Sequence, residues 1–195
     1  MNPDGQSTSN VANNIKRKLN EEGYDVYSDH GEAGEFIGTI AVSYEEKTEG
    51  KLGREEEISQ LDIAVMKRNA NEGIALVEIE ETTDNPKKLI GDIFAVLMGN
   101  SIYLPGKKKR KLDVGDWTTL IIIAEGVAHE PRNKDIQNMA NCARSVFRTT
   151  NLMIGNIVID SFSADKDLED KCLEKVLMDK IYDAIQRDVL SQNRQ

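Results

Sequence analysis

The stretch SQLDIAVMKRNANEGIALVEIEE, residues 59–81, decides the fold of this chain. It contains two short apolar runs, 60–67 and 74–81, separated by the turn-forming residues RNANEG at 68–73. Apolar, β-prone runs joined by such a turn predict a β-hairpin. Side chains on a strand alternate between its two faces, so the odd and the even positions of this hairpin form separate surfaces.

The two surfaces of the predicted hairpin differ in chemistry. The even positions carry Asp62, Glu78 and Glu80, with apolar residues beside them. The odd positions are apolar throughout and predict a core face, made of Leu61, Ile63, Val65, Ala75, Val77 and Ile79. With the turn centred near residue 70 or 71, Asp62 lies opposite Glu78 or Glu80, with Cβ atoms ~5 Å apart.

Carboxylates opposed in this way repel each other and destabilise the strand pair. Two or three oxygen ligands around Mg²⁺, or Mn²⁺, would convert that repulsion into attraction. The hairpin therefore predicts a divalent-cation site. The alternative is an edge hairpin whose carboxylates face water with Lys67 or Lys88 nearby, and the apolar neighbours on the even face weigh against it.

Length and composition narrow the class of protein. A chain of 195 residues suits one domain, and a net charge of −9 argues against a protein that coats nucleic acid without discrimination. No membrane partner is predicted, because the longest apolar run, TTLIIIA at 118–124, is too short to span a bilayer. The first ten residues lack the features of a secretory signal, so a cytoplasmic location is predicted, with Cys142 and Cys172 as buried reduced thiols.

The remaining patterns predict how helices and strands alternate around the hairpin. Residues 1–8 are predicted to be disordered, and 9–195 to form a single domain. Helices are expected at 9–22, 85–99 and 131–148, and a long amphipathic helix at 163–191. Strands are expected at 24–28, 35–44, 101–104, 117–125 and 153–162. This order predicts an α/β (α+β) fold with a mixed central sheet flanked by helices.

A basic run follows Pro105-Gly106 and precedes the next apolar segment. It consists of Lys107, Lys108, Lys109, Arg110 and Lys111. At the tip of a loop, these side chains could contact nucleic-acid phosphates. Such runs are usually solvated turns, and for this segment taken alone the solvated turn is the preferred interpretation.

Two short motifs carry a resemblance to a known family. Gln60-Leu61-Asp62 and Glu78-Ile79-Glu80, followed by DNPKKLIGDI at 84–93, resemble the signature of the restriction-endonuclease-like superfamily, the PD-(D/E)xK phosphodiesterases. That family has a core of helix, three-stranded meander, helix and strand, with an acidic residue on the second strand and acidic-x-Lys on the third. The likeness covers about residues 9–125. Glu80 stands where the family normally has lysine, as it does in some similar nucleases.

The resemblance implies metal-dependent hydrolysis of phosphodiester bonds in nucleic acid, DNA rather than RNA. Asp62, Glu78 and the carbonyl of Ile79 would hold the cation. Glu80, or Lys87 or Lys88 in its place, would orient the attacking water. Two lysines in the first turn of a helix oppose its macrodipole, which favours a nearby acidic site or phosphate. A Lys88–Asp92 pair is the alternative explanation.

Other classes of function remain open at this point. The lysine missing from the motif and the acidic composition also fit a catalytically inactive nuclease-fold module that serves in binding or assembly. The long C-terminal helix could then form the seam of a homodimer, although packing on the sheet explains its apolar stripe too. A third possibility is an unrelated α/β protein whose acidic hairpin binds no metal.

Overall fold

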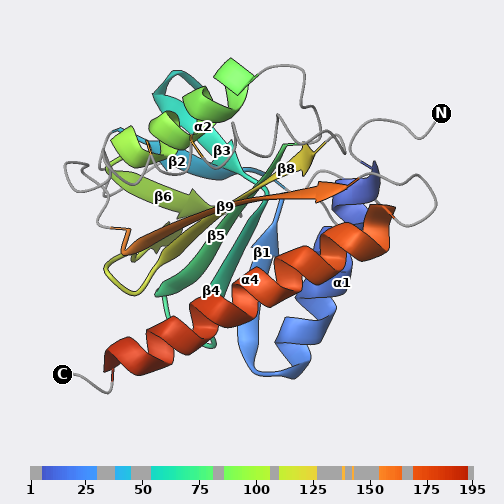
Figure 1. The fold of residues 1–195 in the computed structure, drawn as a ribbon. Helices are drawn as coiled ribbons and strands as arrows, with labels where there is room; N and C mark the ends of the chain where they lie inside the picture. Colours follow the sequence, from blue (N-terminus) through green and yellow to red (C-terminus); the bar gives the residue numbers. More distant parts are fainter. Residues whose placement is uncertain are drawn as a thin grey trace.

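A five-stranded sheet and a four-stranded sheet pack against each other (Figure 1). The computed structural model describes residues 6–29, 38–44, 54–80, 86–105, 110–126, 138, 142, 154–163 and 169–192. The larger sheet has the order β1-β4-β5-β8-β9, and the smaller one the order β3-β2-β6-β7. The α/β fold with a mixed sheet predicted from the sequence is thereby confirmed.

The larger sheet combines an antiparallel and a parallel half. β1 (Tyr24–Ser28), β4 (Ile63–Lys67) and β5 (Gly73–Glu80) form an antiparallel meander. β8 (Thr119–Gly126) and β9 (Asn156–Ser163) continue the sheet parallel to β5. Both β4 and β5 have neighbours on either side, so the acidic hairpin is internal. This excludes the alternative of an edge hairpin.

The smaller sheet is antiparallel and comes from two separate parts of the chain. β2 (Ile40–Ser43) and β3 (Glu57–Leu61) lie between β1 and β4 in the sequence, with a 3-10 turn at Arg54–Glu56 before β3. β6 (Ser101–Leu104) and β7 (Arg110–Leu112) lie between α2 and β8. The pairing of β2 with β6 joins the two parts.

Helices cover the larger sheet on the face that the smaller sheet leaves open. α1 (Gln6–Glu21) and α4 (Glu169–Gln192) lie side by side there (Figure 1). Val11, Ile15 and Leu19 of α1 recur every four residues and are buried, which is the spacing of one helix face. The positive φ of Gly23 lets the chain leave α1 and enter β1. α2 (Pro86–Met98) packs into the opposite core, beside the smaller sheet.

The predicted hairpin differs from the observed strands at its beginning. Residues 60 and 61, predicted to start its first strand, belong to β3 and pair with Ala41 and Ile40 of the smaller sheet. The chain then crosses between the sheets at Asp62, and β4 begins at Ile63. The chain changes sheets here because the residues before Asp62 pair with β2 and those after it pair with β5.

Both faces of the hairpin are buried, where the sequence predicted one core face. The odd positions from Ile63 onward lie in the core with α1 and α4, as a core face predicts, whereas Leu61, also predicted for this face, lies in the opposite core because it belongs to β3. The even positions Ala64, Met66 and Leu76 also lie in a core, because the smaller sheet and α2 cover them. Asp62, Glu78 and Glu80, the acidic members of the even set, lie beyond these apolar residues at one end of the hairpin.

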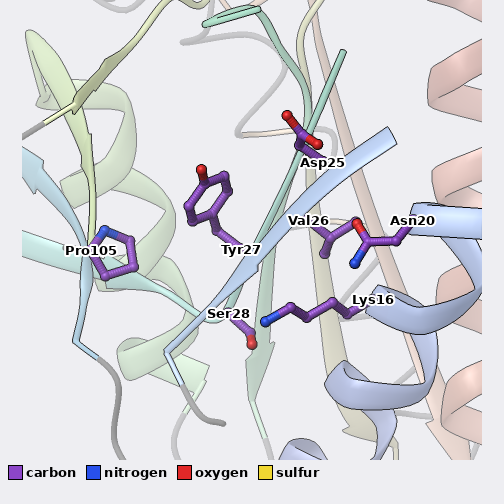
Figure 2. A pocket seen from close by; sticks show the side chains of 7 residues that line it. All are labelled: Lys16, Asn20, Asp25, Val26, Tyr27, Ser28 and Pro105. Atoms are coloured by element: carbon purple, nitrogen blue, oxygen red, sulfur yellow. The ribbon is translucent and has the colours of Figure 1, made fainter. Parts of the chain in front are cut away.

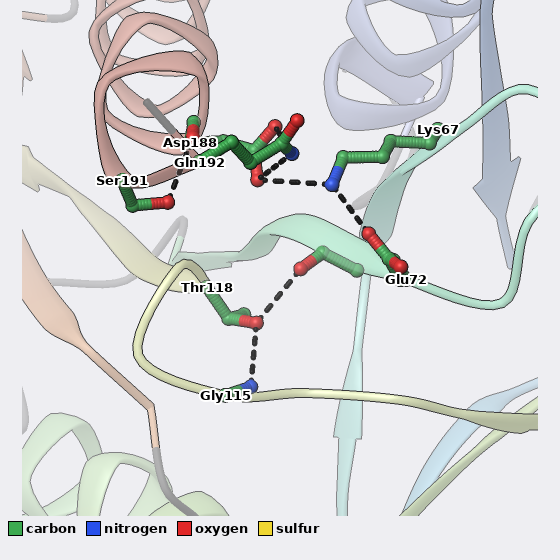
Figure 3. A network of polar contacts seen from close by, with 8 residues as sticks. Lys67, Glu72, Gly115, Thr118, Asp188, Ser191 and Gln192 are labelled. Carbon is green, nitrogen blue, oxygen red and sulfur yellow. Dashed lines mark hydrogen bonds and ion pairs between the residues drawn. The ribbon is translucent and has the colours of Figure 1, made fainter. Parts of the chain in front are cut away.

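The far end of the hairpin is joined to the C-terminal part of α4 (Figure 3). The Lys67 ammonium forms ion pairs with Glu72 and with Asp188, the latter at 3.2 Å. Asp188 is only 3% exposed and accepts two hydrogen bonds from Gln192. Thr118 bridges the start of β5 to the segment before β8, because its hydroxyl donates to the Gly73 carbonyl at 2.7 Å and accepts from the Gly115 N–H.

Two smaller predictions have definite outcomes, and a third lies almost wholly outside the described residues. α1 begins at Gln6, three residues before the start predicted at residue 9. Cys142 is exposed, contrary to its predicted burial, and Cys172 is half-buried. The predicted helix 131–148 lies outside the described residues except for positions 138 and 142, both helical.

The helices provide one further observation, on membrane spanning. Across the parts of the chain that the structure describes, no helix combines the length and the apolar character needed to cross a bilayer.

Candidate functional site

The acidic residues of the hairpin lie at the end of β5 where the chain leaves the larger sheet. Ile63 pairs with Val77, so one step further along the same register Asp62 lies opposite Glu78. Both side chains are half-buried. The Asp62 carboxylate also accepts a hydrogen bond from the Ile79 N–H, at 2.6 Å. The sequence prediction that Asp62 faces Glu78 or Glu80 therefore resolves in favour of Glu78.

Asp62 has a structural task besides any chemical one. At this position β3 departs to the other sheet, so the regular ladder of backbone bonds between β4 and β5 ends. The carboxylate continues the ladder by one step when it binds the Ile79 N–H. A backbone donor that would otherwise lose its partner is satisfied in this way.

Asp29 is an acidic residue of this edge that the sequence patterns did not single out. It directly follows β1, and its backbone N–H donates to the Asp62 carbonyl at 3.3 Å. Ser28 pairs with Ile63, so Asp29 is level with Asp62 in the next strand. Asp29, Asp62 and Glu78 thus form one row across β1, β4 and β5, which we call the acidic row. Asp29 could have been found only by predicting that β1 pairs with β4 and in which register, because that pairing places Asp29 level with Asp62.

Glu80 lies one step beyond the acidic row. It has the strand parity of Glu78 and pairs with Ala124 of β8. Only 4% of Glu80 is exposed, which makes it the most deeply buried carboxylate of this edge. The edge is formed by the carboxyl ends of the parallel strands β5 and β8, the usual place for ligands in sheets with parallel strands.

The donors present suit a hard divalent cation in their chemistry. Carboxylate and carbonyl oxygens are the preferred ligands of Mg²⁺, and one or two carboxylates are enough because the ion keeps several waters. Asp62, Glu78 and the carbonyl of Ile79 supply such a set. Within the described ranges, no three His, Cys, Asp or Glu side chains form a group that could hold a metal ion. A site here would therefore depend on two carboxylates.

The two predicted lysines lie beyond the edge, at the start of α2. Lys87 and Lys88 belong to the first turn of that helix, but their side chains are outside what the structure describes. Lys67, considered as a neighbour of the acids, lies at the other end of β4 and pairs with Glu72 and Asp188.

The predicted basic loop is described only at its end. Lys107, Lys108 and Lys109 lie outside the described residues, and half-buried Lys111 is in β7. The Arg110 guanidinium donates to the Ala70 carbonyl at 2.6 Å, to the Tyr27 hydroxyl at 3.1 Å and to the Asn71 side chain. Its donors are thus used inside the protein, where they fix the hairpin turn and Tyr27.

Glu22 is a carboxylate near the other end of β1, far from the acidic row. Five residues of strand separate it from the acidic row, roughly 17 Å at the usual rise per residue. Its carboxylate accepts a hydrogen bond from the Tyr182 hydroxyl at 2.6 Å. That hydrogen bond is the largest cause, and burial of the phenol the next, that raise the pKa of Tyr182 to about 12.

Among the five tyrosines, Tyr182 is expected to ionise at about pH 12, and Glu22→Gln is expected to lower its pKa. The folded state favours the neutral phenol, so this contribution to stability is complete below pH 10.0 and declines as the pH rises to about 12. Ultraviolet absorbance during alkaline titration measures both proteins. Identical titration curves would contradict the assignment.

Comparison with known proteins found no relative of this chain. No family model, no curated protein and no solved structure matches the chain.

Proposed function

We propose that this protein hydrolyses phosphodiester bonds of nucleic acid, DNA in the first instance, with Mg²⁺ or Mn²⁺ as cofactor. The observation that carries the proposal is the hydrogen bond from the Ile79 N–H to the Asp62 carboxylate, which holds Asp62 beside Glu78 at the carboxyl end of β5. Glu80 and Asp29 bring two more carboxyl groups to the same edge. Oxygen ligands gathered on a rigid sheet, partly shielded from water, suit catalysis by a divalent cation.

The order of elements supports this proposal independently of the acids. α1, the meander β1-β4-β5, α2 and the parallel strand β8 follow one another in the order of the restriction-endonuclease-like core. Asp62 directly precedes the second strand of the meander and Glu78-Ile79-Glu80 ends the third, a placement close to that of the family signature. The smaller sheet is then an addition, inserted before β4 and again before β8.

The predicted site residues of the edge have distinct roles in the proposed reaction. Asp62, Glu78 and the Ile79 carbonyl would hold the cation, which when bound would lower the pKa of a water and stabilise the charge that develops on the phosphate. Glu80 accepts the proton of the attacking water or orients it, the part that lysine takes in the family. The Ile79 N–H keeps the Asp62 carboxylate in a fixed orientation.

Metal titration followed by thermal melting, together with a cleavage assay on mixed DNA and RNA, tests this function. Mg²⁺ or Mn²⁺ at 100 times its Kd is expected to stabilise the wild-type protein by about 2.7 kcal/mol. Glu78→Gln keeps the size of the side chain but removes its charge. It is expected to weaken the metal-dependent stabilisation and to reduce cleavage by at least about 100-fold.

Asp179→Asn is the matched control, since Asp179 is an exposed carboxylate of α4, on the other face of the sheet. It is expected to bind metal and cleave as the wild type does. No thermal shift with Mg²⁺, Mn²⁺ or Ca²⁺ would remove the metal site. Equal cleavage by wild type and Glu78→Gln would remove the proposed catalytic role.

A second candidate function is that of a nuclease-fold module that binds without cutting. It is favoured by Glu80, a deeply buried acid at the position where the family has lysine. Such a protein, a cytoplasmic homodimer in this proposal, would bind nucleic acid in the assay above and leave it intact with every metal.

A further inference from the structure

A groove opens along the free edge of β1 (Figure 2). β1 is the outermost strand of the larger sheet as far as the described residues extend. The groove has a volume of about 380 Å³ and runs between α1 and the end of β6. Its lining consists of Lys16, Asn20, Asp25, Val26, Tyr27, Ser28 and Pro105.

The groove leads directly to the acidic row. Ser28 lines its end, and the next residue is Asp29, whose N–H is bonded to the Asp62 carbonyl. A chain lying in the groove and continuing past Ser28 would therefore come level with Asp29, the member of the acidic row that follows β1. None of the predicted site residues belongs to this groove.

The two walls of the groove offer different chemistry. Lys16 extends from α1 toward Ser28, with the Asn20 amide one turn further along the helix (Figure 2). On the other side, the Tyr27 ring lies between β1 and Pro105. One wall thus provides a cation and an amide, and the other an aromatic ring beside a proline.

Arg110 holds the Tyr27 ring in position. Its guanidinium donates to the Tyr27 hydroxyl at 3.1 Å and is itself anchored on the Ala70 carbonyl at 2.6 Å. The carboxylate of Asp25 accepts the Asn69 N–H at 3.1 Å and points away from Lys16 (Figure 2). The cation and the ring are therefore presented to the groove together, with the Asp25 carboxylate turned aside.

We propose that this groove holds one nucleotide of a single strand whose next phosphate lies at the acidic row. Lys16 contacts a phosphate of that nucleotide, and its base packs on the Tyr27 ring. Positive grooves with aromatic platforms are the general way in which single strands are bound without sequence preference. This inference rests on the proposed function, since it assigns the substrate strand to the same site.

An extended peptide is the other occupant that an open strand edge invites, because it can pair with the backbone of β1. The groove favours a nucleotide for two reasons. Its volume is near the lower limit for ligand pockets, which suits one unit of a chain rather than a strand of several residues. Its cation and its ring stand on opposite walls, as the phosphate and the base of a nucleotide require.

Binding of a short fluorescent oligothymidylate, measured by anisotropy in EDTA, tests the groove without any metal. Lys16→Gln is expected to weaken binding and to reduce the slope of log K against log salt by about 0.7, the share of one phosphate contact. Tyr27→Leu is expected to weaken binding by about tenfold or more, whereas Tyr27→Phe, which keeps the ring, stays close to wild type. Lys175→Gln, at an exposed position of α4, is the charge-matched control and is expected to bind like wild type.

The possible outcomes separate this inference from the proposed function. Unchanged binding by Lys16→Gln and Tyr27→Leu, both folded by thermal melting, overturns the groove and leaves cleavage by the wild type unaffected. Binding that needs Lys16 and Tyr27 but is never followed by cleavage supports the groove and overturns the nuclease. If the wild-type protein binds no oligonucleotide, the proposed nucleotide site is wrong, and an extended peptide paired with β1 becomes the preferred occupant.

Discussion

Replacing Asp62 by asparagine is expected to abolish most cleavage while the protein remains folded. The amide oxygen of asparagine can still accept the Ile79 N–H, which the Asp62 carboxylate accepts at 2.6 Å. The negative charge that would hold the cation is lost. Since loss of groups that only support a metal ligand already costs about 10- to 100-fold, loss of a ligand is expected to cost at least about 100-fold in cleavage.

Asp62→Ala is the companion variant, because it removes the charge and the acceptor together. The N–H of the buried residue Ile79 then loses its partner, which is expected to cost about 1–3 kcal/mol of stability. Comparison of the two variants divides the role of Asp62 into its structural and its chemical parts. The unfolding free energy from urea titration measures the first, and the rate of cleavage under Mg²⁺ measures the second.

Two results would contradict this division. Asp62→Asn that cleaves as fast as wild type would deny the carboxylate any chemical role. If Asp62→Asn were as unstable as Asp62→Ala, the amide oxygen of asparagine would not replace the carboxylate as acceptor of the Ile79 N–H.

Replacing Lys67 by methionine is expected to destabilise the fold by about 3 kcal/mol. Asp188 is 3% exposed, and Lys67 is the cation paired with it, at 3.2 Å. Without the ammonium, a carboxylate remains charged in the core at the junction of α4 and the hairpin. The lower end of the usual range for a broken buried pair applies, because the Lys67 side chain is 26% exposed.

A double-mutant cycle in urea measures this coupling. Lys67→Met/Asp188→Leu is expected to recover much of the lost stability, because no buried charge remains. Lys18→Met is the matched control: it breaks the Lys18–Glu174 pair, whose lysine is 47% exposed, and is expected to cost at most about 1 kcal/mol. Equal costs for the two lysines would refute the importance of burial.

The pH dependence of the Lys67 contribution follows from its pKa. Burial opposes the charged form, but hydrogen bonds to Glu72 and Asp188 outweigh it and raise the pKa of Lys67 above 10.5. The folded state therefore favours the protonated ammonium. Its stabilising effect is complete below pH 10.5 and is lost only as the pH rises through the folded value.

Periodic patterns in the sequence predicted most of the fold. The alternation along Val77, Glu78 and Ile79 defines which face of β5 is acidic, and that holds because strand parity is a local property. The stripe of Val11, Ile15 and Leu19 predicted the buried face of α1 for the same reason. Local patterns of this kind also located the carboxyl groups of Glu78 and Glu80 at one end of a strand.

Pairing between distant segments could not be predicted in this way. Leu61 has the pattern of the hairpin but joins the smaller sheet, because Ile40 competes for it as a partner. Asp29 belongs to the acidic row only through the register of β1 with β4. Arg110 reads as part of a basic loop, and its use inside the protein follows from the approach of Ala70 and Tyr27, which no local pattern contains.

The crossing of the chain at Asp62 has a consequence for the order in which the protein folds. The β4–β5 hairpin closes over a short turn, whereas the smaller sheet needs Ala41 to meet Tyr103 and other partners equally remote along the chain. Remote pairings form slowly, because long loops must close first. We therefore expect Asp62 and Glu78 to come together early in refolding. Pro105, which directly follows β6, completes the groove only later, when the smaller sheet forms.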